Sequence, residues 1–142
     1  SVSFFCATSP MFFTYLDLSS NSMAKPIQNC WEKFQSLEVL NLANNSLTGR
    51  IPKSSGSLRQ IESMHLNNNF SGEIPLLTLC TSLKFIDFGD NNIEGTLPTW
   101  VGHSLHHLIV LRLRGNKIHG SIPTSLRNIL SLQVLNLSAN NM

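Results

Sequence analysis

Residues 37–52 read LEVLNLANNSLTGRIP, a stretch in which apolar, Asn, Gly and Pro residues hold fixed positions. The pattern is Leu-x-x-Leu-x-Leu-x-x-Asn-x-Leu-x-Gly-x-Ile-Pro. Residues 83–98 (LKFIDFGDNNIEGTLP) and 108–123 (LIVLRLRGNKIHGSIP) follow it with conservative exchanges. The pattern returns about every 24 residues, and a period in this range is typical of a solenoid built from stacked repeats.

The period predicts one solenoid over all 142 residues. Residues 1–12 end an earlier repeat, repeats one to five cover residues 13–36, 37–60, 61–82, 83–107 and 108–131, and residues 132–142 begin a truncated sixth. The repeats start 24, 24, 22, 25 and 24 residues apart. Because repeat three is short, we expect local distortion in it.

Each repeat contains two apolar residues spaced two apart, such as Leu40 and Leu42 or Leu111 and Leu113. This period of two predicts a short β-strand. Successive strands would then stack into a parallel sheet with a spacing of about 4.8 Å. No single repeat closes a core, so stability must come from contacts between neighbouring repeats.

An asparagine lies eight residues after the start of every repeat. The column consists of Asn21, Asn45, Asn69, Asn91, Asn116 and Asn140. Since Asn carries both a donor and an acceptor, we predict a buried ladder that satisfies backbone groups where the strand turns inward. The alternative, that Asn merely marks turns, predicts scattered positions. A glycine follows in repeats two to five, whereas repeat one has Lys25 there, and we expect distortion at that point as well.

The chain resembles the plant-type leucine-rich-repeat proteins over essentially its whole length. Finer phrases, such as SFFC at residues 3–6, NCW at 29–31 and CTSLKFIDFGDNNIEGTLPTW at 80–100, are similar to plant receptor-like proteins, which are membrane-anchored receptors without a kinase. The resemblance implies an α/β-type, strand-dominated solenoid. It would form a right-handed arc with a concave parallel sheet, a second short strand near Gly-x-Ile-Pro, and irregular or short helical convex segments.

The same resemblance implies a recognition role at the extracellular side of the plasma membrane, in defence signalling. Its implied partners are a protein or peptide ligand and a co-receptor kinase, with a glycan or a cell-wall-degrading enzyme as further options. Two alternatives stay open: a secreted inhibitor of polygalacturonase, and the ectodomain of a leucine-rich-repeat receptor kinase.

The non-leucine strand positions should face the concave surface, where solenoids usually bind. Aromatic and Arg residues are frequent anchors of interfaces. The candidate ligand-binding residues are Tyr15, Asp17, Asn41, His65, Phe85, Asp87, Arg112 and Arg114. The alternative is a solvated face in which Arg112 pairs with Asp87 and binds nothing.

Cys6 and Cys30 lie one repeat apart, so neighbouring repeats would bring them within reach of a disulfide, which an extracellular protein would oxidise. Two free buried thiols are the alternative. Cys80 takes the place of leucine in other repeats, and we expect it to be buried.

Three Asn-x-Ser sequons occur, at Asn44, Asn69 and Asn136. We predict a glycan at Asn44, in an exposed turn, and at Asn136, where it would obstruct the concave face. We predict none at Asn69, which the spacing assigns to the buried ladder.

Other functions have little support in the sequence. The formal charge of +2 gives no argument for nucleic acid, and no apolar run is long enough for a membrane span. His103, His106 and His107 lack a nearby Cys or carboxylate, so we expect a solvated loop and no metal. No motif for catalysis or for a cofactor is evident.

The first residues contain neither an initiator Met nor a basic signal-peptide region, and we expect an internal fragment.

Overall fold

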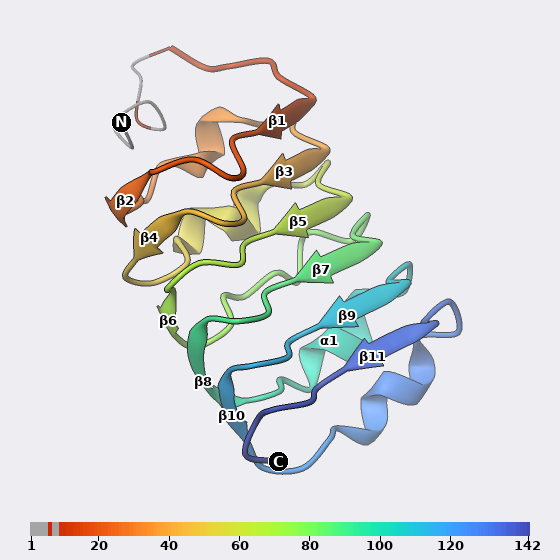
Figure 1. Ribbon diagram of the computed structural model, residues 1–142. Coiled ribbons are helices and arrows are strands. Elements are labelled where there is room, and N and C mark those ends of the chain that lie inside the picture. Colours follow the sequence, from red (N-terminus) through yellow and green to blue (C-terminus); the bar gives the residue numbers. More distant parts are fainter. Residues whose placement is uncertain (1–5, 7–8) are drawn as a thin grey trace.

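The computed structural model describes residue 6 and residues 9–142. Each repeat contributes one strand to a parallel six-stranded sheet that runs the length of the molecule (Figure 1). The strands are β1 (Tyr15–Asp17), β3 (Val39–Asn41), β5 (Ser63–His65), β7 (Phe85–Asp87), β9 (Val110–Arg112) and β11 (Val134–Asn136), in that order. The solvent-facing side of this sheet is called the concave face below.

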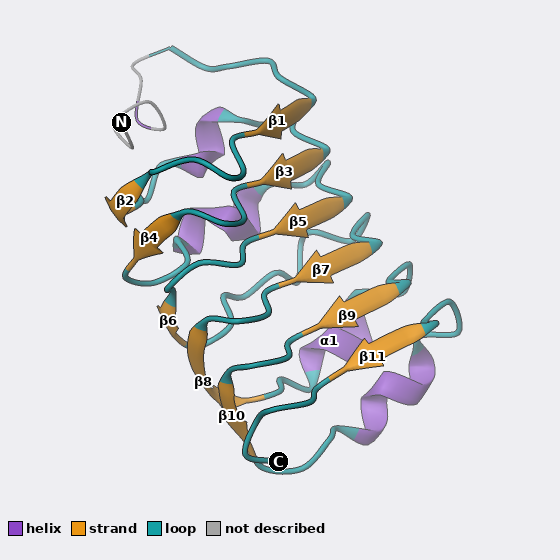
Figure 2. Cartoon of the chain, in the orientation of Figure 1, coloured by secondary structure: helices purple, strands orange, loops and turns teal. Residues whose placement is uncertain are grey.

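A second set of short strands follows each turn and lines one flank of the solenoid (Figure 2). One sheet pairs β2 (Ala24–Pro26) with β4 (Ser46–Thr48), and the other contains β6 (Ser71–Gly72), β8 (Asn92–Thr96) and β10 (Lys117–His119). Short helices return the chain on the convex side: η2 (Trp31–Lys33), η3 (Lys53–Ser57), α1 (Trp100–Ser104) and η4 (Thr124–Asn128). The predicted strand-dominated solenoid is thereby confirmed.

The core lies between the long sheet and the convex segments. Leu40, Met64, Ile86 and Leu111 pair in register on successive strands, and each is almost fully buried. Burying a side chain of this size contributes roughly 1.5–3 kcal/mol, so most of the stability comes from contacts between repeats. No helix among the described residues is long and apolar enough to cross a membrane.

The asparagine ladder exists, with a different member in repeat three. Asn91 shows the geometry of a full rung: its Oδ1 accepts hydrogen bonds from the backbone N–H of Asn68 and Phe70, at 3.0 and 2.9 Å. Its Nδ2 donates to the carbonyls of Leu66 and Phe88. A ladder of this kind satisfies backbone groups on two neighbouring repeats.

The prediction that Asn69 belongs to the ladder is wrong. Asn68 is buried and takes the position, accepting from the N–H of Asn45 and Leu47 at 3.2 Å each, while Asn69 is exposed. The physical reason is a turn that is one residue shorter. In the other repeats the residue before the ladder asparagine has a positive φ; these residues are Ser20, Asn44, Asp90, Gly115 and Ala139. Repeat three lacks this residue, so the ladder position falls seven residues after Ile61.

The second missing residue of repeat three lies on the convex side. Pro75 and Cys80 are five positions apart, whereas the matching Pro52 and Leu58 are six apart. Within residues 73–84, all of which the structure describes, no helix forms. The expected distortion of repeat three is therefore confirmed at both ends of the repeat.

In repeat one, Lys25 adopts φ of 74°, close to the 76° of Gly49 at the matching position of repeat two. A left-handed backbone is costly for a residue with a Cβ. The chain therefore keeps the geometry of the repeat and places the strain on Lys25.

A disulfide joins Cys6 to Cys30, with 5.4 Å between their Cα atoms. Cys80 is buried, as predicted, and its thiol lies 3.5 Å from the carbonyl oxygen of Ser55. Burial raises the pKa of this thiol to about 11.

Candidate binding surface

The concave face presents two columns of side chains from the long sheet. One contains Tyr15, Val39, Ser63, Phe85, Val110 and Val134, and the other contains Asp17, Asn41, His65, Asp87, Arg112 and Asn136. Because the buried leucines occupy the positions between them, both columns point away from the core, and Val110 is the one member that is nevertheless buried. The columns match the register expected from the sequence.

Four members of the second column share a structural task. The Oδ1 atom of each accepts a hydrogen bond from the backbone N–H two residues later, a common role of Asp and Asn in turns. The four residues are Asp17, Asn41, Asp87 and Asn136. The pKa of Asp17 lies below its usual value because its carboxylate interacts with the side-chain hydroxyl of Ser19 and, second, with the Ser19 backbone N–H. In this column His65 and Arg112 are the two residues of other types, and their side chains do not close such a turn.

His65 and Arg112 both contact Phe85, which lies between them. The His65 ring stacks on the Phe85 ring with centroids 4.6 Å apart. The guanidinium carbon of Arg112 lies 5.7 Å from the centroid of Phe85, within the range of a cation–π contact. Ser63 Oγ and His65 Nε2 also form a hydrogen bond at 3.0 Å. We call His65, Phe85 and Arg112 the concave stack; it spans repeats three to five.

The ion pair between Arg112 and Asp87, which was the alternative to ligand binding, does not form in the described part of the chain. Asp87 Oδ1 instead accepts from Asn67 Nδ2 at 2.9 Å and from the N–H of Gly89 at 3.0 Å. Among the described residues Arg112 forms no ion pair. Its charge is therefore exposed beside an aromatic ring and is not neutralised by a carboxylate.

Arg114 follows Arg112 on the same side of the chain, and its Nη1 lies 3.6 Å from Asp90 Oδ1. Both side chains are more than half exposed, and exposed pairs of this kind contribute about 0–1 kcal/mol. An anionic ligand can therefore replace Asp90 at little cost. Tyr15 is 62% exposed on β1, three strands away from Phe85, and does not join the concave stack.

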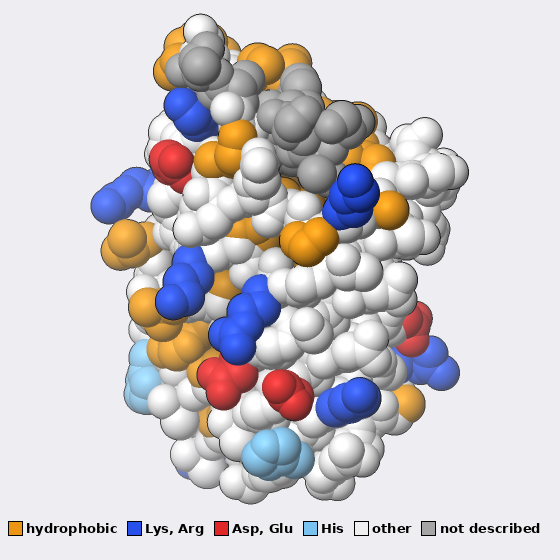
Figure 3. Space-filling view, turned by 90° about the vertical axis from the view of Figure 1, so that its left-hand side faces the viewer, with side chains coloured by type: hydrophobic (Ala, Val, Ile, Leu, Met, Phe, Trp, Pro, Cys, Tyr) orange, Lys and Arg blue, Asp and Glu red, His pale blue; other side chains and the backbone are white. Residues whose placement is uncertain are grey.

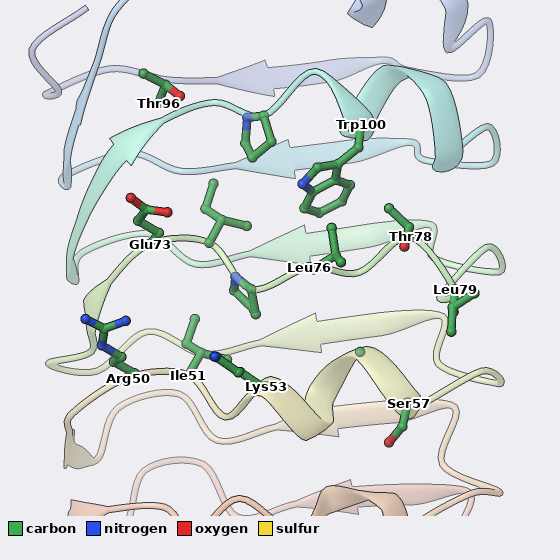
Figure 4. Close-up of a pocket in the computed structure, with 14 residues that line it drawn as sticks. Arg50, Ile51, Lys53, Ser57, Glu73, Leu76, Thr78, Leu79, Thr96 and Trp100 are labelled. Carbon is green, nitrogen blue, oxygen red and sulfur yellow. The ribbon is translucent and has the colours of Figure 1, made fainter.

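Sequence reasoning did not identify Asn67 as the residue that positions Asp87. It also missed a groove of about 840 Å³ on the convex side, between η3 and α1 (Figure 4). Leu76 and Leu79, 63% and 51% exposed, lie along it together with Trp100. The groove opens where repeat three lacks a helix, and the short length of that repeat was the available signal.

The flank that carries the second strands has charged side chains of both signs. Basic and acidic side chains are interspersed over this side, without a large field of one sign (Figure 3). Searched over the described residues, the chain contains no group of three His, Cys, Asp or Glu side chains placed to hold a metal ion. His103, His106 and His107 are exposed at and after α1.

Comparison with known proteins adds three kinds of similarity. A family model described as Leucine Rich Repeat matches residues 36–58, 82–104 and 107–129. Receptor-like protein 53 of Arabidopsis thaliana is 36% identical over 120 residues, 82% of this chain and 12% of the relative. Receptor-like protein EIX2 of Solanum lycopersicum is 38% identical over 125 residues, 87% of this chain and 12% of the relative. The chain thus spans about an eighth of the length of these two relatives.

Among solved structures, the chain is similar to the ectodomain of the Arabidopsis thaliana receptor kinase GASSHO1/SCHENGEN3, in complex with CASPARIAN STRIP INTEGRITY FACTOR 2. The TM-score is 0.88 at 35% identity, over 91% of this chain and 16% of the other. The Arabidopsis receptor kinase HAESA, in complex with the peptide hormone IDA and the co-receptor SERK1, gives a TM-score of 0.85 at 32% identity. That match covers 89% of this chain and 22% of HAESA.

Proposed function

Because this chain belongs to the plant leucine-rich-repeat proteins of the receptor-like type, we propose that it is a recognition segment of a cell-surface receptor ectodomain that acts in defence signalling. Its partners are a peptide or protein ligand and a co-receptor kinase. The similarity to ectodomains that were solved with peptides and with a co-receptor supports this assignment. The Cys6–Cys30 disulfide is in keeping with an extracellular location.

The concave stack is the observation that carries the proposal. It combines an aromatic surface with a cation that has no acidic partner among the described residues, and it adjoins a second Arg in a weak, exposed pair. Two Arg side chains two residues apart, at the end of β9 and just after it, suit a carboxylate, which Arg binds through charge-assisted hydrogen bonds. We propose that the ligand places an acidic group, such as an acidic side chain or a free C-terminal carboxylate, against Arg112 and Arg114.

The proposed mechanism is passive. The paired strands hold the concave face rigid, so a ligand binds a preformed surface and loses little affinity to ordering of the receptor. Binding then changes the association of the ectodomain with its co-receptor. No chemical step is assigned to this chain.

The test measures binding of a panel of synthetic peptides to the full chain by calorimetry. Each peptide is supplied with a free and with an amidated C-terminus. We expect the double substitution R112A/R114A to weaken binding of the best free-acid peptide by roughly tenfold to a hundredfold, because hydrogen bonds to charged groups contribute about 1.5–3 kcal/mol.

The matched control is R59A/R127A, which removes the same charge from two exposed Arg residues on the convex side. Affinity should be unchanged in this control. If the folded R112A/R114A protein binds as tightly as the wild type, the two Arg residues are not the ligand site.

A further inference from the structure

We propose that Asn69 is a site of N-linked glycosylation, although the repeat spacing assigns this asparagine to the buried ladder. The proposal rests on the proposed extracellular function, since glycan transfer occurs in the secretory pathway. It follows from the shortened turn of repeat three, which gives the ladder position to Asn68 and leaves Asn69 outside it.

In the sequon Asn69-Phe70-Ser71, burial of the middle residue leaves the two polar residues at the surface. Phe70 is fully buried, whereas Asn69 and Ser71 on either side of it are exposed. Neighbouring residues of an extended chain point to opposite sides, so burial of Phe70 directs both polar residues of the sequon to solvent. Their exposure is therefore a consequence of core packing.

The side-chain amide of Asn69 is also unengaged. The only hydrogen bond that Asn69 makes with the described residues comes from its backbone N–H, which donates to the carbonyl of Leu47 at 2.9 Å. Asn68, one residue earlier, uses both side-chain atoms in the ladder. A glycan on Asn69 Nδ2 would therefore displace nothing, while the same group on Asn68 would break the core.

The chemistry is a group transfer from an oligosaccharide carried on a polyprenyl pyrophosphate. The Asn69 Nδ2 atom forms a bond to the anomeric carbon of the first sugar and loses one proton. The bond between that carbon and the pyrophosphate oxygen breaks, and the lipid pyrophosphate leaves. No electrons are exchanged with an oxidant or reductant.

A glycan at Asn69 would act together with one at Asn44. Asn44 is exposed in the corresponding turn of repeat two, and the two turns are linked directly, since the N–H of Asn44 donates to the carbonyl of Asn67. The corner between the two sheets would be covered over repeats two and three. In repeats four and five the same corner carries Asp90 and Arg114 and has no sequon. The two glycans would therefore leave the corner of repeats four and five as the part that a partner can reach.

The test is peptide mapping of the full chain expressed through the secretory pathway of plant cells. Trypsin places the three sequons in separate peptides, residues 34–50, 60–84 and 128–142. Release with a peptide N-glycosidase in ¹⁸O water converts each glycosylated Asn to labelled Asp. We expect the label at Asn69 in peptide 60–84, and its loss in the variants Asn69→Gln and Ser71→Ala.

The matched control is Asn92→Gln, which changes the exposed residue that follows the ladder asparagine of repeat four and lies in no sequon. It should leave the label at Asn69 intact. An unlabelled Asn69 in a chain whose Asn44 is labelled would overturn the proposal and leave the extracellular function standing. Absence of label at all three sequons would also overturn the glycosylation proposal, and the proposed function would then be judged by the peptide-binding test alone.

Discussion

Repeats two and three bury apolar residues at matching strand positions and pair strand to strand, yet their connecting segments differ. Leu40 and Met64 are in register on β3 and β5. The turn after β5 is one residue shorter than the turn after β3, and the convex return has lost both a residue and a helix. The comparison shows which features the solenoid must keep and which it can change.

What both repeats keep is the set of backbone hydrogen bonds. Asn45 and Asn68 differ in their distance from the start of the repeat, yet each donates from Nδ2 to the carbonyl of Leu42, just after β3, at 3.0 and 2.8 Å. Unpaired backbone groups in a core are costly. The ladder therefore stays in place, and the turn adjusts its length around it.

The largest expected effect separates two adjacent asparagines in repeat three. Asn68→Ala removes the acceptor of the N–H groups of Asn45 and Leu47 and the donor to Leu42. Each buried group left unsatisfied costs about 1–3 kcal/mol, so the free energy of unfolding should fall by about 3 kcal/mol or more. Asn69→Ala should change it by less than about 0.5 kcal/mol.

Urea unfolding of the two variants, both made without glycans, provides the measurement. Asn45→Ala in repeat two is the control for a ladder residue whose position the spacing predicts, and it should resemble Asn68→Ala. Equal losses for Asn68→Ala and Asn69→Ala would mean that the ladder of repeat three is not confined to Asn68.

The asparagine ladder also shows how far the sequence could predict the structure. The strand columns were predictable because alternation in a strand has a strict period of two, so Phe85 and Arg112 were placed correctly on the concave face. Counting eight residues from Ile61 failed because it assumes a turn of constant length. The run Asn67-Asn68-Asn69 offers three candidates, and only the backbone torsions decide among them.

The candidate site shows the same division. Its residues could be assigned to a face, but their contacts depend on side-chain rotamers between neighbouring strands. The sequence left open whether Arg112 pairs with Asp87 or faces a ligand. In the structure Asn67 and Gly89 engage Asp87, and Arg112 lies over Phe85. The convex groove depends on a helix that is missing, and such an absence has no local sequence motif.

A smaller effect concerns the left-handed position shared by repeats one and two. Lys25 and Gly49 have nearly the same φ, and a residue with a Cβ is strained there by about 1–3 kcal/mol. Lys25→Gly should therefore raise the free energy of unfolding by about 1 kcal/mol. Gly49→Ala should lower it by at least as much, since the new Cβ would lie 3.1 Å from Pro26 Cβ. Thermal unfolding of both variants checks the two signs, and a destabilised Lys25→Gly protein would show that its side chain contributes more than its backbone costs.

A last comparison, in its pH dependence, tests whether the shortened convex segment of repeat three is as well packed as its counterpart in repeat two. Cys80 takes the place of Leu58, and burial raises the pKa of its thiol to about 11, whereas the thiol of an unfolded chain titrates near 8.5. The folded protein therefore holds this proton more tightly than the unfolded chain does. The contribution to stability is complete below about pH 8.5 and is lost as the pH rises toward 11.

The measurement compares the free energies of unfolding of the wild type and of Cys80→Ala from pH 7 to pH 10. The two values should approach each other only above about pH 8.5. Curves that stay parallel across the range, or rapid alkylation of Cys80 in the folded protein, would show that the short segment opens to solvent and that loss of the helix has loosened the repeat.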